Sequence, residues 1–220
     1  MRKVLAFIGL TGLLVMAMSS HLFAQDETKA ADETVREGVQ SILTVVRKYA
    51  GSEDEAARQA YLDEVTELLE PVIGYSVIAR KVMGEAYGAA TRAQKIRFLD
   101  VFERSMVNTY AGGIYAFGAF EVNLLPSQDD KKDTLRNTRV YMEVVSPDGP
   151  KYPLVQSVYF SRESGDWKMQ NAIFNGINLG VTFRTQFEQL YSQAGGDLDA
   201  TIIAWERITE DAYKNTRFRE

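Results

Sequence analysis

The chain has 220 residues, of which 45% are hydrophobic and 25% are charged, and its formal net charge is −5. It contains no Cys, and its one His, His21, lies at the end of an apolar N-terminal stretch. Beyond that stretch the sequence therefore excludes Ser-His-Asp triads, Cys-His pairs, metal sites built on His or thiolate, and disulfides. The acidic balance also disfavours a non-specific nucleic-acid binder.

The N-terminus has the pattern of a secretory signal peptide. Arg2 and Lys3 precede an apolar run from Val4 to Met18, and small and polar residues follow. The run is short for a membrane span, which needs about 20 apolar residues, and no stop-transfer segment follows it. We therefore expect a signal peptide over residues 1–24, cleaved after Ala24; the alternative is an uncleaved anchor. Export of a chain without Cys favours a bacterial periplasm.

The predicted mature chain, residues 25–220, keeps 23 basic and 30 acidic residues once Arg2 and Lys3 are removed, for a net charge near −7. Its length suits one domain with a sizeable core. We expect an acidic domain of this kind not to adhere to anionic membranes by charge.

Two parts of the chain, about 31–118 and 178–212, have apolar residues at helical spacing. Thr91 and Gln94 form a capping-box pattern, in which each side chain accepts a hydrogen bond from the backbone N–H of the other residue. Asn178 is a candidate N-cap for the helix that follows the strands.

The stretch between them, about 120–174, predicts a sheet. Its four runs are rich in β-branched and aromatic residues and are separated by Pro126, Asp148-Gly149 and Ser164-Gly165. They cover residues 121–125, 138–146, 152–161 and 166–173. Short connections between successive strands favour an antiparallel meander, so we expect an α+β fold in which helices lie on one face of a four-stranded sheet.

Alternation along the strands predicts which side chains share a face. The groups are Val140, Met142 and Val144 in the second strand, Leu154, Gln156, Val158 and Phe160 in the third, and Trp167, Met169 and Asn171 in the fourth. The pattern leaves open which face of the last two strands is buried, because Val155 and Tyr159 compete with Leu154 and Val158.

The sequence favours binding over catalysis. Glu143 and Tyr159 are the sheet residues that could act as acid or base, and both are expected to face outward. Methionines are spread over elements expected to face each other, and Met packs adaptably around flexible chains. A filled core is the alternative interpretation, because composition does not show a void.

Three segments resemble the MlaC family, the toluene-tolerance auxiliary family of ABC transport. The first is Val-Met-Gly-Glu-Ala-Tyr-Gly-Ala-Ala-Thr at 82–91, with Gln94, Phe98, Phe102 and Thr109-Tyr110 after it. The second is Trp-Lys-Met-Gln-Asn at 167–171 running into Gly176, and the third is Phe183-Arg-Thr-Gln-Phe187. The resemblance covers about 35–208. The chain departs from the family at Asn171, Asn175 and Asn178, where an acid, an acid and Ser are usual.

The resemblance implies a periplasmic lipid carrier without catalysis, cofactor or metal. The family's fold is a twisted four-stranded antiparallel sheet of the NTF2/cystatin-like kind, with an apolar cavity between sheet and helices for acyl chains. Its members take phospholipid between an outer-membrane lipoprotein–porin complex and an inner-membrane ABC transporter that bears an MCE-domain protein, which maintains outer-membrane lipid asymmetry. We expect a monomer.

The predicted lipid-binding side chains combine the inward faces of helices and strands with the resemblance. They are Val82, Phe98, Phe102, Met106, Val140, Met142, Val144, Val158, Phe160 and Met169. Two acyl chains hold on the order of 28 methylenes, so the expected cavity reaches about 1,000 Å³, the upper end of the usual range.

Three alternatives stay open. The same fold could carry a hopanoid or another terpenoid lipid. It could be an enzyme on an NTF2-like sheet, which would need a polar residue deep in the pocket. It could also be a non-catalytic adaptor of an ABC transporter, which a fully packed core would support.

Overall fold

The computed structural model describes residues 31–52, 54–112, 114, 120–128 and 132–217. The predicted signal peptide, residues 1–24, its cleavage site after Ala24, and residues 115–118 of the predicted helical part lie outside these ranges. Within them, no helix is both long and apolar enough to cross a membrane.

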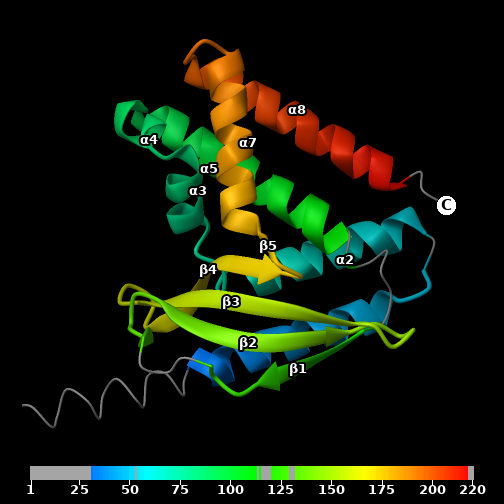
Figure 1. Cartoon of the computed structure of the whole chain (residues 1–220). Helices are drawn as coiled ribbons and strands as arrows, with labels where there is room; N and C mark the ends of the chain where they lie inside the picture. Colours follow the sequence, from blue (N-terminus) through cyan, green and yellow to red (C-terminus); the bar gives the residue numbers. More distant parts are fainter. Residues whose placement is uncertain (1–30, 53, 113, 115–119, 129–131, 218–220) are drawn as a thin grey trace, which may run out of the picture.

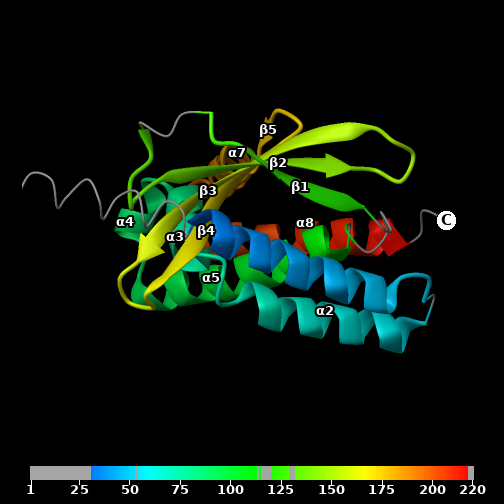
Figure 2. The same ribbon diagram turned by 90° about the horizontal axis from the view of Figure 1, so that it is seen from below.

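The described chain begins with two helices that lie side by side (Figure 2). The N-terminal helix covers residues 31–49, and α2 covers Glu55–Leu69. Asp54 caps α2 by accepting a hydrogen bond from the backbone N–H of Ala56. The two helices bury Val45, Val46, Tyr61, Leu62 and Val65 in one apolar cluster.

The remaining helices form a bundle above the sheet in Figure 1. Their bounds are α3 (Tyr75–Met83), α4 (Ala86–Ala89), α5 (Arg92–Met106), α7 (Leu179–Gln193) and α8 (Leu198–Arg217). A π-helical turn, η1 (Val107–Ala111), continues α5. Trp205 of α8 is the centre of an aromatic cluster that includes Phe98 and Phe102 of α5 and Phe183 and Phe187 of α7.

Both predicted caps are confirmed. The Thr91 hydroxyl accepts from the Gln94 backbone N–H at 3.2 Å, and the Gln94 side chain accepts from the Thr91 backbone N–H at 3.0 Å. The Asn178 side chain accepts from the Val181 backbone N–H at 3.2 Å and so caps α7. These bonds satisfy helix N–H groups that have no partner within the helix.

The sheet is the antiparallel meander that the sequence predicts, with one more strand. Its strands run in the order β1 (Glu121–Leu125), β2 (Thr138–Val145), β3 (Lys151–Ser161), β4 (Asp166–Phe174) and β5 (Ile177–Asn178). The fifth strand was not expected. Asn175 and Gly176 have positive φ angles of 47° and 82°, which Asn and Gly tolerate, and they turn the chain so that two residues pair with the end of β4.

The register decides which face of the sheet is buried. Val140, Met142 and Val144 are buried, as predicted from alternation in β2. Val140 pairs with Gln156 and Met142 with Leu154, so the even-numbered side chains of β3 share this face. Figure 2 shows the N-terminal helix and α2 on one side of the sheet, and the N-terminal helix packs against this inward face.

A β-bulge in β4 makes one face prediction wrong. Val158 pairs with Met169 and Ser157 with Asn171, so Gln170 is an extra residue without a partner in β3. Beyond the bulge the alternation shifts by one, and Ala172, not Asn171, shares the inward face with Met169. The buried Gln170 side chain accepts a hydrogen bond from Lys81 Nζ at 2.6 Å and donates one to the Arg136 carbonyl at 2.8 Å.

Candidate functional site

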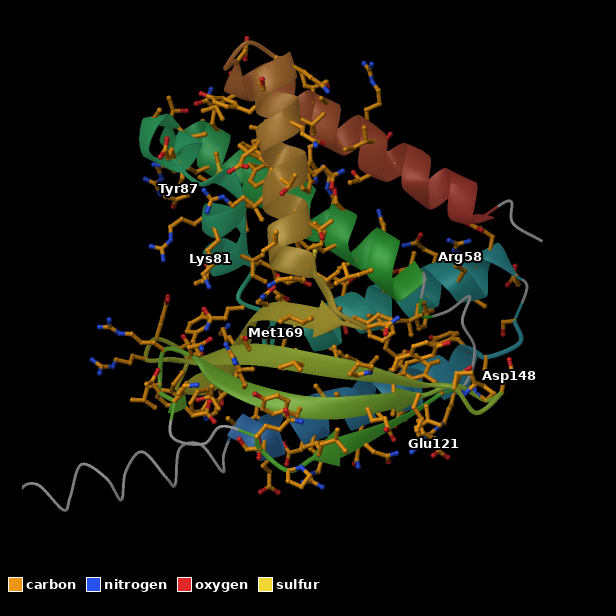
Figure 3. The ribbon with its side chains drawn as sticks, viewed as in Figure 1. Arg58, Lys81, Tyr87, Glu121, Asp148 and Met169 are labelled. Atoms are coloured by element: carbon orange, nitrogen blue, oxygen red, sulfur yellow. The ribbon has the colours of Figure 1, made fainter. Side chains whose placement is uncertain are left out.

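An apolar cavity of about 220 Å³ lies where the helices meet the inward face of the sheet. Its walls come from the N-terminal helix, α2, the first residue of α3, the end of α5 with η1, strands β3 and β4, and the first residue of α7. Figure 3 shows Met169, one of the wall residues, on β4 between the sheet and the helical bundle. The wall therefore joins segments that lie far apart in the chain.

The N-terminal helix forms one wall through Val35, Val39 and Ile42, and through Gly38 between them. A Cβ atom added at Gly38 would meet no heavy atom within 4 Å. Glycine inside a helix costs about 0.5–1 kcal/mol relative to alanine. Because Gly38 has no side chain, the cavity extends to the helix backbone. This explains why a glycine occupies a helix position where alanine would be more stable.

The end of α5 supplies Met106, and the π-helical turn η1 supplies Ala111. A π-helical turn is rare and often occurs at functional sites. The buried Tyr61 hydroxyl donates to the Ala111 carbonyl at 3.0 Å, which ties the turn to α2. This bond holds the irregular backbone in place beside the cavity.

Four side chains with hydrogen-bonding capacity interrupt the apolar walls: Thr34, Tyr75, Gln156 and Trp167. Tyr75 is 6% exposed and Trp167 is 3% exposed. The Tyr75 hydroxyl and Trp167 Nε1 are buried and have no hydrogen-bond partner among the described residues. Burial, reinforced by Glu103 and Glu70, raises the pKa of Tyr75, so its hydroxyl stays protonated.

Three of the ten predicted lipid-binding residues line this cavity: Met106, Val158 and Met169. Val82, Phe98 and Phe102 are buried in the helical core around Trp205 instead. Helical periodicity identified their buried face correctly. However, that face meets α7 and α8, because the bundle is thick enough to form a core of its own.

The other predicted strand residues point inward but lie beside the cavity. Val140 and Met142 pack against Ala31 and Val35 of the N-terminal helix, which fills the space in front of them. Val144 is buried further along β2.

Phe160 packs edge-on against Trp167, with ring centroids 5.6 Å apart, and borders a separate hollow. That hollow is also lined by Arg136 and Arg162. The role of the ten residues in lipid binding remains a prediction.

The predicted residue set left out the wall formed by the N-terminal helix, and also Val65 and Leu69 of α2. Val35, Val39 and Ile42 recur at helical spacing, and Gly38 interrupts the pattern inside the helix. That glycine is the signal that could have indicated a close approach. Helical spacing alone did not show that this stripe faces the sheet.

The cavity is also smaller than expected, at about 220 Å³ against the predicted ~1,000 Å³. The reason is packing: side chains of the N-terminal helix occupy much of the space over β2 and β3. Two acyl chains do not fit in this volume unless the walls move apart.

Neither candidate acid–base group of the sheet reaches the cavity. Glu143 accepts a hydrogen bond from Lys151 Nζ at 2.8 Å. Tyr159 lies on the outward face with its ring over Gly74, where an added Cβ would lie 2.7 Å from the ring. Burial and the charge of Glu163 raise the pKa of Tyr159. The described residues hold no group of three or more acidic side chains that could bind a metal ion.

The α+β fold and the cavity define a protein that binds an apolar molecule between a meander sheet and its helices. The chain belongs to the MlaC family, since the model of the MlaC protein family matches residues 36–207. It is 32% identical over 147 residues to the toluene tolerance protein Ttg2D of Pseudomonas putida, a match that covers 66% of each chain, just under two thirds.

A solved structure has the same fold. The phospholipid-binding protein from Ralstonia solanacearum, in complex with a phospholipid, matches with a TM-score of 0.67. The match covers 84% of this chain and 98% of that chain at 23% sequence identity.

Proposed function

We propose that this protein carries phospholipid through the periplasm. It takes the lipid between an outer-membrane lipoprotein–porin complex and an inner-membrane ABC transporter bearing an MCE-domain protein, and so maintains outer-membrane lipid asymmetry. Membership of the MlaC family and the phospholipid in the Ralstonia structure support this proposal. The observation that carries it is the apolar cavity between the N-terminal helix and the sheet.

The physical need for a carrier follows from the lipid's solubility. About 28 methylenes at about 0.8 kcal/mol each give roughly 20 kcal/mol that opposes free diffusion of a phospholipid through water. An apolar cavity inside a soluble domain offsets this cost. The acyl chains occupy the cavity, and the head group stays near its mouth in solvent.

In this proposal the signal peptide, residues 1–24, is cleaved after Ala24, and residues 25–220 form one lipid-binding domain that acts as a monomer. The domain works without catalysis, cofactor, metal or nucleic acid. Tyr75 is the one titratable side chain among the described wall residues, which supports a binding role.

The second candidate is a non-catalytic adaptor that docks to the same transporter without lipid. The cavity volume of about 220 Å³ favours it, because this volume is well below that of two acyl chains. The two functions differ in whether the protein holds lipid in the periplasm.

Native mass spectrometry tests the proposal on mature protein purified from a bacterial periplasm, with solvent extraction and lipid identification. We expect one phospholipid per protein. A hopanoid or other terpenoid lipid would redirect the proposal to that cargo. An empty protein that also takes no lipid from vesicles would contradict the carrier function and leave the adaptor.

A further inference from the structure

We propose that Tyr75, Gln156 and Trp167 form a hydrogen-bonding site inside the cavity for the ester carbonyl oxygens of a bound glycerolipid. This inference rests on the proposed carrier function and refines its substrate class to ester-linked lipids. It assigns the three side chains as specificity-determining residues. They come from α3, β3 and β4 and meet at one cavity.

Two of the three side chains have buried donors without a partner in the described structure, the Tyr75 hydroxyl and Trp167 Nε1. Buried polar groups in folded proteins are nearly always hydrogen-bonded, so each exception calls for an explanation. Tyr61, a buried tyrosine of the neighbouring α2, follows the rule, since its hydroxyl donates to the Ala111 carbonyl at 3.0 Å. Tyr75 therefore differs from Tyr61: it lines the cavity, and its buried hydroxyl has no partner among the described residues.

An unpartnered indole N–H does not by itself mark a site. Trp205 Nε1 is also buried without a partner, but Trp205 lies in the aromatic core of the bundle. Trp167 differs because it borders the cavity together with Tyr75. The inference rests on this pairing of two donors at one cavity.

Gln156 is the third member. Its pairing with Val140 on one side and Ala172 on the other places it on the inward face of the sheet, between apolar neighbours. Gln156 is half-buried, and a polar residue on this inward face contradicts the local apolar pattern. Such conflicts are expected at functional sites. Gln156 lines the same cavity, and its side-chain amide has two N–H donors.

The chemistry of this wall selects among ligand groups. The walls are apolar apart from these neutral side chains and Thr34, and none of the described wall residues carries a positive charge for a phosphate. A hydrocarbon or terpenoid skeleton offers no acceptor to the donors. An acyl ester combines a long apolar chain with a carbonyl oxygen, which fits both the walls and the donors.

The test compares two lipids that differ only at this group. Full mature protein is offered equal amounts of diacyl phosphatidylglycerol and the di-O-alkyl ether analogue of equal chain length, and native mass spectrometry measures the ratio bound. We expect the diacyl form to be retained about ten-fold over the ether form, the ratio that corresponds to ~1.4 kcal/mol. Tyr75→Phe and Gln156→Met should each move this ratio towards one, because each removes a donor that only the diacyl form can use.

Tyr87→Phe is the matched control, because Figure 3 shows Tyr87 on α4, well away from Met169 at the cavity. It should keep the wild-type ratio. Infrared spectra of lipid labelled with carbon-13 at the ester carbonyl give a second measurement. The carbonyl stretch should lie at lower frequency in wild type than in Tyr75→Phe. Thermal unfolding checks that each variant folds. If Tyr75→Phe does not fold, the lipid ratio of Gln156→Met decides the test.

The outcomes separate this inference from the proposed function. Equal retention of both lipids by wild type would overturn the ester site and leave the carrier function intact. Retention of neither lipid would overturn the carrier function. A diacyl preference that survives both substitutions would overturn the assignment to Tyr75 and Gln156.

Discussion

Tyr75 combines two properties that a single residue of an apolar wall seldom has. It is 6% exposed, and its hydroxyl has no hydrogen-bond partner among the described residues. A buried donor left unsatisfied costs about 1–3 kcal/mol, whereas a satisfied one contributes about 1 kcal/mol. We therefore expect substitution by Phe to have opposite effects on stability at Tyr75 and at Tyr61.

We expect Tyr75→Phe to raise the free energy of unfolding of the lipid-free protein, by about 1 kcal/mol, because it removes an unsatisfied hydroxyl. Tyr61→Phe should lower it by about 1 kcal/mol, because the bond to the Ala111 carbonyl is lost. Urea unfolding of both variants measures the difference. Equal destabilisation by the two substitutions would show that the Tyr75 hydroxyl has a partner.

Glu103 on α5 gives a pH-dependent prediction. Burial raises the pKa of its carboxyl above the ordinary 4.5, and Glu70 and Asp100 reinforce the shift. Because this pKa is raised in the folded state, the contribution of Glu103 to folding stability is fully present below pH 4.5. It is lost as the pH rises through the folded-state pKa.

Glu103→Gln should therefore raise the unfolding temperature at pH 7 to 8, where wild-type Glu103 is ionised, and this gain should vanish below pH 4.5. Thermal unfolding across this range measures it. A gain of equal size at every pH would mean that the charge of Glu103 is not the cause.

At the scale of elements, the N-terminal helix both closes the cavity and limits its size. Val35 packs on the sheet, while Gly38 leaves the helix backbone open to the cavity. α4 holds a comparable glycine, Gly88, where an added Cβ would also meet no heavy atom within 4 Å. Gly88 is exposed and lies outside the cavity wall, so the two glycines form a matched pair.

We expect Gly38→Leu to fill part of the cavity and lower the amount of lipid bound per protein, while raising the free energy of unfolding by about 1 kcal/mol through helix propensity. Gly88→Leu should change stability in the same direction and leave bound lipid unchanged. Lipid extraction and urea unfolding measure the two quantities. Equal lipid loading of both variants would place the lipid elsewhere.

The same scale shows where local patterns stop being sufficient. Thr91, Gln94 and Asn178 act within a few residues of themselves, and their capping roles are visible in the sequence. The bulge at Gln170 is not, because it depends on a register that β3 and β4 adopt together. One extra residue there moves Asn171 off the inward face and puts Ala172 in its place.

For the whole molecule, the cavity volume of about 220 Å³ determines what loading requires. The strands are joined by backbone hydrogen bonds, and the bundle is held by interlocking aromatic rings around Trp205. The N-terminal helix meets the sheet through side-chain contacts such as those of Ala31 and Val35. We therefore expect this helix to move when lipid enters.

Spin labels test this movement, and the absence of Cys from the chain restricts them to introduced positions. The distance between spin labels at Glu37 and Arg139, exposed on the N-terminal helix and β2, should increase on phospholipid loading. As a control, the distance between labels at Arg139 and Gln189, exposed on β2 and α7, should not change. If neither distance changes in protein shown to hold lipid, loading does not use this helix.

The sequence by itself determined the order of the elements, the antiparallel meander, the caps and the buried face of β2. It also indicated the MlaC family through three short segments, a resemblance that the family match confirmed. Each of these depends on residues close together in the chain, where periodicity, propensity and capping act. Such signals can be followed along one sequence.

Only the tertiary structure decided which buried side chains border the cavity. Phe98 and Met106 both lie on α5, yet Phe98 packs in the helical core and Met106 lines the cavity. Periodicity shows that a side chain points inward, but the element that it meets is set by packing between distant segments. Packing between distant segments also brings together Gly38, Tyr75 and Gln156 at the cavity. Their spacing in the sequence does not predict this.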